Sequence, residues 1–204
     1  MAIEFQQDKQ LFTLNTKHTT YQMKVDRLGF LLHLYYGERI SGSMDYLLTY
    51  YDRGFSGNPA DAGNDRTYSL DALPQEYPQA GAGDYRSSAL VIRNADGSEY
   101  CDLRYVSHEI RRGKYGLKGL PAAYAPEAEA ESLAILLEDS VSRVQVRLLY
   151  GVLADEDIIT RSAEIINLGD SPVCVEKAAS ACLDFVGGEY DLVSFYGRHA
   201  MERN

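Results

Sequence analysis

The stretch "RVQVRLLYGVL" (residues 143–153) alternates apolar with polar side chains along its first half. From Val144 to Tyr150 every second residue is apolar, and "TYQMKV" (20–25) has the same spacing. Successive side chains of a β-strand point to opposite faces, so a period of two is typical of a strand with one buried face. Both stretches are therefore predicted to be strands that cover a core.

Turn signals separate further apolar runs. Asp96-Gly97 lies inside "ALVIRNADGSEYCDLRY" (89–105), and Asp-Gly favours a hairpin because both residues tolerate positive φ. In "AEIINLGDSPVCVEKA" (163–178) the letters GDSP separate two runs in the same way. Strands at such intervals indicate a sandwich or barrel.

The helical signal is weak. "EAEAESLAILLE" (127–138) is a helix by propensity, or a polar loop that leads into a strand at 133–137, which we favour. The neighbouring "GLKGLPAAYAPEAE" (116–129) is interrupted by two prolines and is predicted to be a loop. We predict an all-β fold, an antiparallel β-sandwich with little helix, formed by residues 1–204 as a single domain.

Composition excludes some functions. The 204 residues include 20 basic and 30 acidic side chains, a net charge of −10. Such a surface repels phosphate, so we expect neither nucleic acid nor an anionic membrane as partner. No signal peptide or membrane-spanning stretch is evident. The three cysteines are too few for a disulfide framework, so we expect small buried cysteines and a cytoplasmic protein.

Few residue patterns indicate chemistry. The four histidines are isolated, and Cys174 and Cys182 are too far apart for a zinc knuckle. "GAGDYR" (81–86) lacks the lysine of a phosphate-binding loop. Carboxylates are numerous, but no pair can be singled out as the two acids of a glycosidase. We expect no metal and no cofactor.

The strongest local feature is "YYDRGFSGNPADAGNDRTYSLDALPQEYP" (50–78), called segment 50–78 below. It has no helix or strand period, yet it is too aromatic to be disordered. Long loops of this kind are usually functional. Asp52, Asn58 and Arg66 interleave with aromatic residues, as in sugar sites. The alternative is that Phe55 and Tyr68 anchor the loop while Asp52 and Arg66 form a local ion pair, and residue types alone favour this alternative.

Several motifs in this order resemble the N-terminal domain of bacterial α-galactosidases (melibiases) of glycoside hydrolase family 36. They include "GFLLHLYYGERI" (29–40), "DRGFSGNP" (52–59), "DRTYSLDALPQEYP" (65–78), "GDYRSSAL" (83–90) and "ITRSAEIINLG" (159–169). The resemblance covers nearly the whole chain. It implies a large β-sandwich, a supersandwich, that precedes a catalytic (β/α)₈ barrel.

The resemblance also implies an activity. The family's barrel hydrolyses terminal α-D-galactosyl bonds of melibiose and raffinose-type sugars with retention, through two aspartates. No residue of this chain matches either aspartate. We therefore expect a chain truncated before the barrel, with no catalytic residue and no glycosidase activity alone.

Finally, the resemblance implies a use for segment 50–78. In tetrameric members the corresponding loop reaches over the sugar pocket of a neighbouring subunit. Asp52 matches an acidic residue that hydrogen-bonds the α-galactoside, and Arg66 matches an arginine beside a pocket aromatic. Phe55 and Asn58 belong to the same loop. Homo-oligomers are therefore expected. Two alternatives remain: a stand-alone carbohydrate-binding sandwich, and a purely structural interaction domain.

Overall fold

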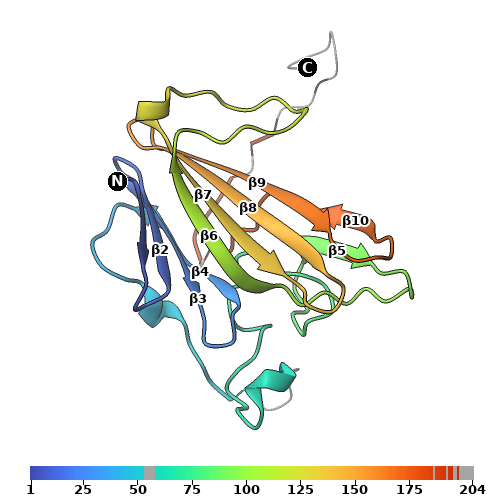
Figure 1. Ribbon diagram of the computed structural model, residues 1–204. Helices are drawn as coiled ribbons and strands as arrows, with labels where there is room; N and C mark the ends of the chain where they lie inside the picture. Colours follow the sequence, from blue (N-terminus) through green and yellow to red (C-terminus); the bar gives the residue numbers. More distant parts are fainter. Residues whose placement is uncertain (53–57, 186, 192, 195–196, 198–204) are drawn as a thin grey trace.

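The computed structural model describes residues 1–52, 58–185, 187–191, 193–194 and 197. Within these residues the chain forms two four-stranded antiparallel sheets and one two-stranded sheet (Figure 1). The first sheet has the order β1 (Ile3–Gln6), β2 (Leu11–Asn15), β3 (Thr19–Val25) and β4 (Leu31–Glu38). The second has the order β6 (Arg104–Arg112), β7 (Glu131–Glu138), β8 (Val144–Leu153) and β9 (Ile158–Asn167). The third pairs β5 (Leu90–Arg93) with β10 (Cys174–Ala178).

Helix is scarce, as predicted. Within the described residues it is limited to three 3₁₀ turns, η1 (Asp45–Leu47), η2 (Ala60–Ala62) and η3 (Glu127–Glu129). In that part of the chain no helix has the length and apolarity needed to span a bilayer. The all-β antiparallel sandwich is therefore confirmed.

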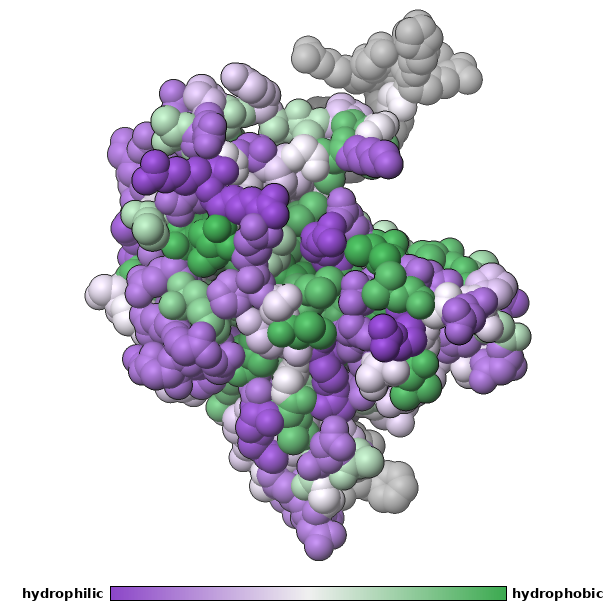
Figure 2. Space-filling view, viewed as in Figure 1, coloured by the Kyte–Doolittle hydropathy of each residue, from purple (hydrophilic) through white to green (hydrophobic). Residues whose placement is uncertain are grey.

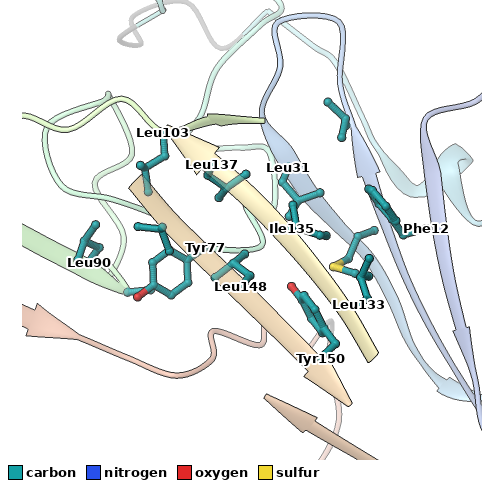
Figure 3. Packing of buried hydrophobic residues seen from close by; sticks show 14 of the residues in the cluster. Phe12, Leu31, Tyr77, Leu90, Leu103, Leu133, Ile135, Leu137, Leu148 and Tyr150 are labelled. Atoms are coloured by element: carbon teal, nitrogen blue, oxygen red, sulfur yellow. The ribbon is translucent and has the colours of Figure 1, made fainter. Parts of the chain in front are cut away.

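The main core lies between the sheets, where alternate side chains meet. Leu133, Ile135 and Leu137 of β7 stand opposite Tyr150, Leu148 and Val146 of β8. All of these residues are at most 3 % exposed. Figure 3 shows the three β7 residues, Leu148 and Tyr150 with Phe12 and Leu31 of the first sheet, and with Tyr77 and Leu90. The predicted strands at residues 20–25, 133–137 and 144–150 are confirmed. The expectation of a single buried face is wrong for residues 20–25, because Thr20 and Gln22 are buried as well as Tyr21 and Met23.

The predicted hairpin at Asp96-Gly97 is wrong, although its turn forms. Gly97 has φ 86°, and the Asn94 N–H donates to the Ser98 carbonyl over 2.8 Å. The strands on either side do not pair with each other, because β5 pairs with β10 and β6 pairs with β7. The chain between them turns inward and buries Cys101 and Leu103 in the core. The local turn was predictable, whereas strand pairing depends on residues far along the chain.

The cysteine prediction is only partly correct. All three cysteines are free, and Cys101 is buried as expected. Cys174 is exposed, because every residue of β10 faces solvent in this two-stranded sheet.

Candidate functional site

Segment 50–78 follows η1 and projects at the lower end of the molecule in Figure 1, where η2 forms part of it. Phe55 lies outside the described residues, so the structure does not place this predicted site residue. Asp52, Asn58 and Arg66 are described and belong to this projection.

Asp52 and Arg66 face each other. The Nε atom of Arg66 lies 3.5 Å from Oδ2 of Asp52, and the side chains are 64 % and 52 % exposed. Exposed ion pairs contribute about 0–1 kcal/mol. This contact agrees with the alternative interpretation of the sequence, in which Asp52 and Arg66 form a local ion pair. It also presents a carboxylate and a guanidinium together at the surface, and these groups bind hydroxyls directionally.

Asn58 braces the segment internally. Its Nδ2 donates to the carbonyl oxygen of Asp65 over 2.9 Å. Asp65 in turn accepts from the backbone and side chain of Thr67 and from Arg27. The Thr67 hydroxyl, the Thr67 backbone N–H and Arg27 together lower the pKa of Asp65. Residues 58–67 of the segment are therefore held together by hydrogen bonds.

The segment is anchored by Tyr68, which is fully buried as the anchoring alternative expected. Its hydroxyl donates to Asp26, whose other carboxylate oxygen accepts from the backbone N–H groups of Leu28 and Phe30. Burial, followed by the Asp26 carboxylate, raises the pKa of Tyr68. Tyr68 belongs to a second apolar cluster, which contains Phe30, Leu32, Ala62, Tyr68, Leu70 and Leu73.

The C-terminal part of the segment enters the sandwich, which sequence reasoning missed. Glu76 is fully buried, and its carboxylate accepts from Tyr21 and Tyr150, both at 2.7 Å. Arg161 Nη1 lies 2.8 Å and His33 Nδ1 3.1 Å from the same carboxylate. No residue pattern identified Glu76, because an acidic chain offers many such carboxylates.

Charge explains how Glu76 remains ionised in the core. Burial raises its pKa, but Arg161, then His33 and Tyr21, outweigh this effect, so the pKa is lowered. Arg161 also stacks on the Tyr150 ring, with Cζ 4.8 Å from the centroid. Since Glu76 is shielded from solvent and fully hydrogen-bonded, its role is structural.

The motifs "DRTYSLDALPQEYP" (65–78) and "GDYRSSAL" (83–90) are joined by hydrogen bonds. Asp84 of "GDYR" accepts from Gln75 over 2.9 Å and from Arg86 over 2.7 Å. Arg86 also donates to the carbonyls of Leu70 and Leu73 over 3.0 and 2.6 Å. The paired motifs thus fix the base from which the exposed loop projects.

An open cavity of about 450 Å³ lies beside the loop. Asn58, Asp61, Tyr100, Asp102 and Arg104 line it, with residues 81–83. Arg104 lies 3.4 Å from Asp61 and 2.8 Å from Asp102, so one guanidinium is shared by two carboxylates and a net negative charge remains. Within the described residues no group of three His, Cys, Asp or Glu side chains could hold a metal ion.

The sequence profile of the glycosyl hydrolase family 36 N-terminal domain matches residues 29–204. The chain belongs to this family. Among its relatives is the bifunctional alpha-galactosidase/sucrose kinase AgaSK of Mediterraneibacter gnavus, which is 63 % identical over 100 % of this chain and 22 % of its own length. The family 36 chain thus spans about a fifth of that relative.

Solved structures agree with this assignment. The galactosidase domain of AgaSK superposes with a TM-score of 0.94 at 62 % identity, covering 100 % of the family 36 chain and 28 % of its own. A variant of alpha-galactosidase AgaA from Geobacillus stearothermophilus, in complex with raffinose, has a TM-score of 0.80 at 39 % identity. That match covers 84 % of this chain and 24 % of the AgaA chain.

Proposed function

We propose that this chain is the non-catalytic N-terminal domain of a retaining α-galactosidase that removes terminal α-D-galactosyl residues from melibiose and raffinose-type sugars. The observation that carries the proposal is the family 36 N-terminal match over most of the chain. The alpha-galactosidase AgaSK and the raffinose complex of AgaA support the substrate class. A cytoplasmic location fits the three free cysteines.

In this proposal segment 50–78 helps to shape the sugar pocket of a neighbouring subunit. Asp52 accepts hydrogen bonds from galactosyl hydroxyls, and Arg66 lies next to an aromatic residue of the pocket. Phe55 and Asn58 complete the loop. The support is the exposed Asp52–Arg66 pair on a loop whose base is buried at Tyr68. Binding residues are often carried by loops on a rigid scaffold.

The experiment uses a chimera in which this chain replaces the matching segment of AgaSK from Mediterraneibacter gnavus. Asp52→Ala is expected to lower kcat/KM by the equivalent of roughly 1–3 kcal/mol, the scale of a lost hydrogen bond to a charged group. The control is Asp8→Ala, another exposed aspartate, in the β1–β2 turn. Equal kinetics for the two variants and the parent chimera would exclude a role for Asp52 in the sugar pocket.

The same chimera tests the non-catalytic role. The isolated chain is expected to give no turnover of a chromogenic α-galactoside, whereas the chimera turns it over. Reproducible turnover by the isolated chain, lost on replacing one of its own carboxylates, would contradict the proposal. Binding of galactose to the isolated chain without turnover would instead support a stand-alone carbohydrate-binding module.

A further inference from the structure

Arg27 joins segment 50–78 to the turn between β3 and β4. Its Nη2 donates to Oδ2 of Asp65 over 2.6 Å. Its guanidinium also lies over the ring of Tyr68, with Cζ 4.9 Å from the centroid. One arginine therefore contacts both the exposed loop and the buried residue that anchors it.

Both ends of this link are attached to fixed backbone. On one side, Arg27 stands between Asp26 and Leu28, and Asp26 Oδ1 accepts from the Leu28 N–H over 2.9 Å. On the other side, Asp65 Oδ1 accepts from the N–H and hydroxyl of Thr67 over 2.9 and 2.6 Å. The two side chains are 51 % and 38 % exposed, so the ion pair alone contributes little, but its ends are attached to residues that make further contacts.

The link places the candidate sugar-contacting residues. Arg66 stands between Asp65 and Thr67, which hydrogen-bond to each other across it. Asn58 donates to the Asp65 carbonyl, and Asp52 lies 3.5 Å from Arg66. All three described site residues are thus attached, directly or through one neighbour, to Asp65.

We infer that Asp65 and Arg27 are positioning residues, which hold Arg66, Asn58 and Asp52 in the geometry that contacts the sugar. The inference rests on the proposed function. Neither residue needs to touch the substrate itself. A site held within a fraction of an ångström binds better than the same groups on a loose loop.

The chain offers a matched control in Asp96. Its Oδ1 accepts from the N–H and hydroxyl of Ser98 over 2.9 and 2.7 Å, which reproduces the Asp65–Thr67 turn. In the described part of the chain Asp96 has no ion pair with an arginine or lysine. Asp96→Asn therefore measures the effect of changing such a turn without an ion pair. Asp65→Asn changes the same kind of turn and also removes the charge that Arg27 contacts.

The first readout is amide hydrogen exchange of the 204-residue chain. Asp65→Asn and Arg27→Ala are expected to speed exchange across residues 58–67, since local opening sets the exchange rate. Arg27→Lys is expected to restore part of the protection. Asp96→Asn is expected to leave residues 58–67 as in the parent chain. Unchanged exchange in the first two variants would overturn the inference.

The second readout is kinetics in the AgaSK chimera. Asp65→Asn and Arg27→Ala are expected to raise KM by roughly 2- to 5-fold with kcat nearly unchanged, since they loosen binding groups without touching the catalytic ones. Arg27→Lys is expected to recover part of the KM. A similar KM for Asp96→Asn and Asp65→Asn would overturn the inference, because general loosening would then explain both.

Asp52→Ala separates the two proposals. If it raises KM while Asp65→Asn speeds exchange but leaves KM unchanged, the loop contacts sugar without needing the link, and the positioning role is wrong. If Asp52→Ala itself has no effect, the proposed role of segment 50–78 in the sugar pocket fails, and the inference fails with it.

Discussion

Glu76 places a negative charge at the centre of the sandwich, where it receives hydrogen bonds from residues of both large sheets. Tyr21 and His33 belong to the first sheet, and Tyr150 and Arg161 to the second. Nε and Nη2 of Arg161 are buried and have no hydrogen-bond partner within the described structure. The buried positive charge of Arg161 is therefore compensated in this cluster by the negative charge of Glu76.

Replacing Glu76 with Gln is expected to destabilise the chain by about 3–5 kcal/mol, because it leaves Arg161 as an uncompensated buried charge. Urea unfolding at neutral pH measures this. The control is Glu164→Gln, whose exposed pair with Arg147 is worth under about 1 kcal/mol. The double variant Glu76→Leu with Arg161→Met removes both charges. If its free energy of unfolding is as low as that of Glu76→Gln, the loss of stability in Glu76→Gln is not due to an unpaired charge.

Two glycines in turns have similar positive φ values but different surroundings. Gly97 (φ 86°) has open space where a Cβ would lie, whereas a Cβ on Gly81 (φ 93°) would lie 2.8 Å from the Cα of Tyr100. Gly97→Ala is expected to cost roughly 1–2 kcal/mol from backbone strain alone. Gly81→Ala should cost more, since the backbone of Tyr100 must also move. Equal unfolding midpoints for the two variants would contradict this.

At the scale of elements, the turn between β8 and β9 is tied to the turn between β2 and β3. Asp157 Oδ1 accepts from the Thr16 hydroxyl over 2.8 Å and from the His18 N–H over 2.7 Å. His18 Nδ1 lies 2.6 Å from Oδ2. His18, then its backbone N–H and Thr16, lower the pKa of Asp157 from 3.8 to about 2. The two large sheets are thus joined at this end by the Asp157 carboxylate and by the Lys17 N–H, which donates to the Ala154 carbonyl over 2.8 Å.

This shift has a defined pH dependence. Because the folded pKa lies below the unfolded value, the stabilisation by Asp157 is complete above about pH 3.8 and is lost as the pH falls toward 2. Asp157→Asn should therefore make stability fall less steeply between pH 4 and pH 2, measured by urea unfolding. Asp155→Asn, in the same turn but without a side-chain hydrogen bond in the described structure, should leave the slope unchanged. A steeper slope in Asp157→Asn would contradict the assignment.

Strands were predictable from the sequence where the spacing of apolar residues within a few positions indicates the buried face. The period of two in residues 20–25 and 144–150 was enough to place β3 and β8, although β3 is buried on both faces. Pairing partners were not predictable, since β5 finds β10 across roughly 80 residues of chain. In segment 50–78 the exposed Asp52–Arg66 pair was anticipated as one alternative. The buried carboxylate of Glu76 was not, because nothing in its neighbours marks it as internal.

At the scale of the whole molecule, apolar side chains reach the surface at the start of segment 50–78 and just before it. Tyr46, Leu47, Tyr50 and Tyr51 are each more than 40 % exposed. Figure 2 shows that apolar patches alternate with hydrophilic residues on the face in view. Exposed apolar patches often mark association sites. These four residues are therefore a candidate subunit interface next to the exposed part of segment 50–78.

The isolated chain is therefore expected to form dimers or larger homo-oligomers. Sedimentation velocity over a wide concentration range measures this, with mass expected to rise with concentration. Tyr46→Ser combined with Tyr51→Ser should reduce association, while Tyr124→Ser, at a more exposed tyrosine on the 113–126 connection, should not. A strictly monomeric profile at the highest concentration would exclude self-association of this chain.

The pairing of β5 with β10 also has a consequence during synthesis. The ribosome completes β5 well before β10, and the intervening residues take roughly 4–16 s to add at 5–20 residues per second. For that time the edge of Leu90–Arg93 has no partner strand, although Leu90 and Ile92 are destined for the core. During this interval the edge of β5 can pair with a wrong strand or bind a chaperone. The interval ends only when Cys174–Ala178 emerges from the ribosome.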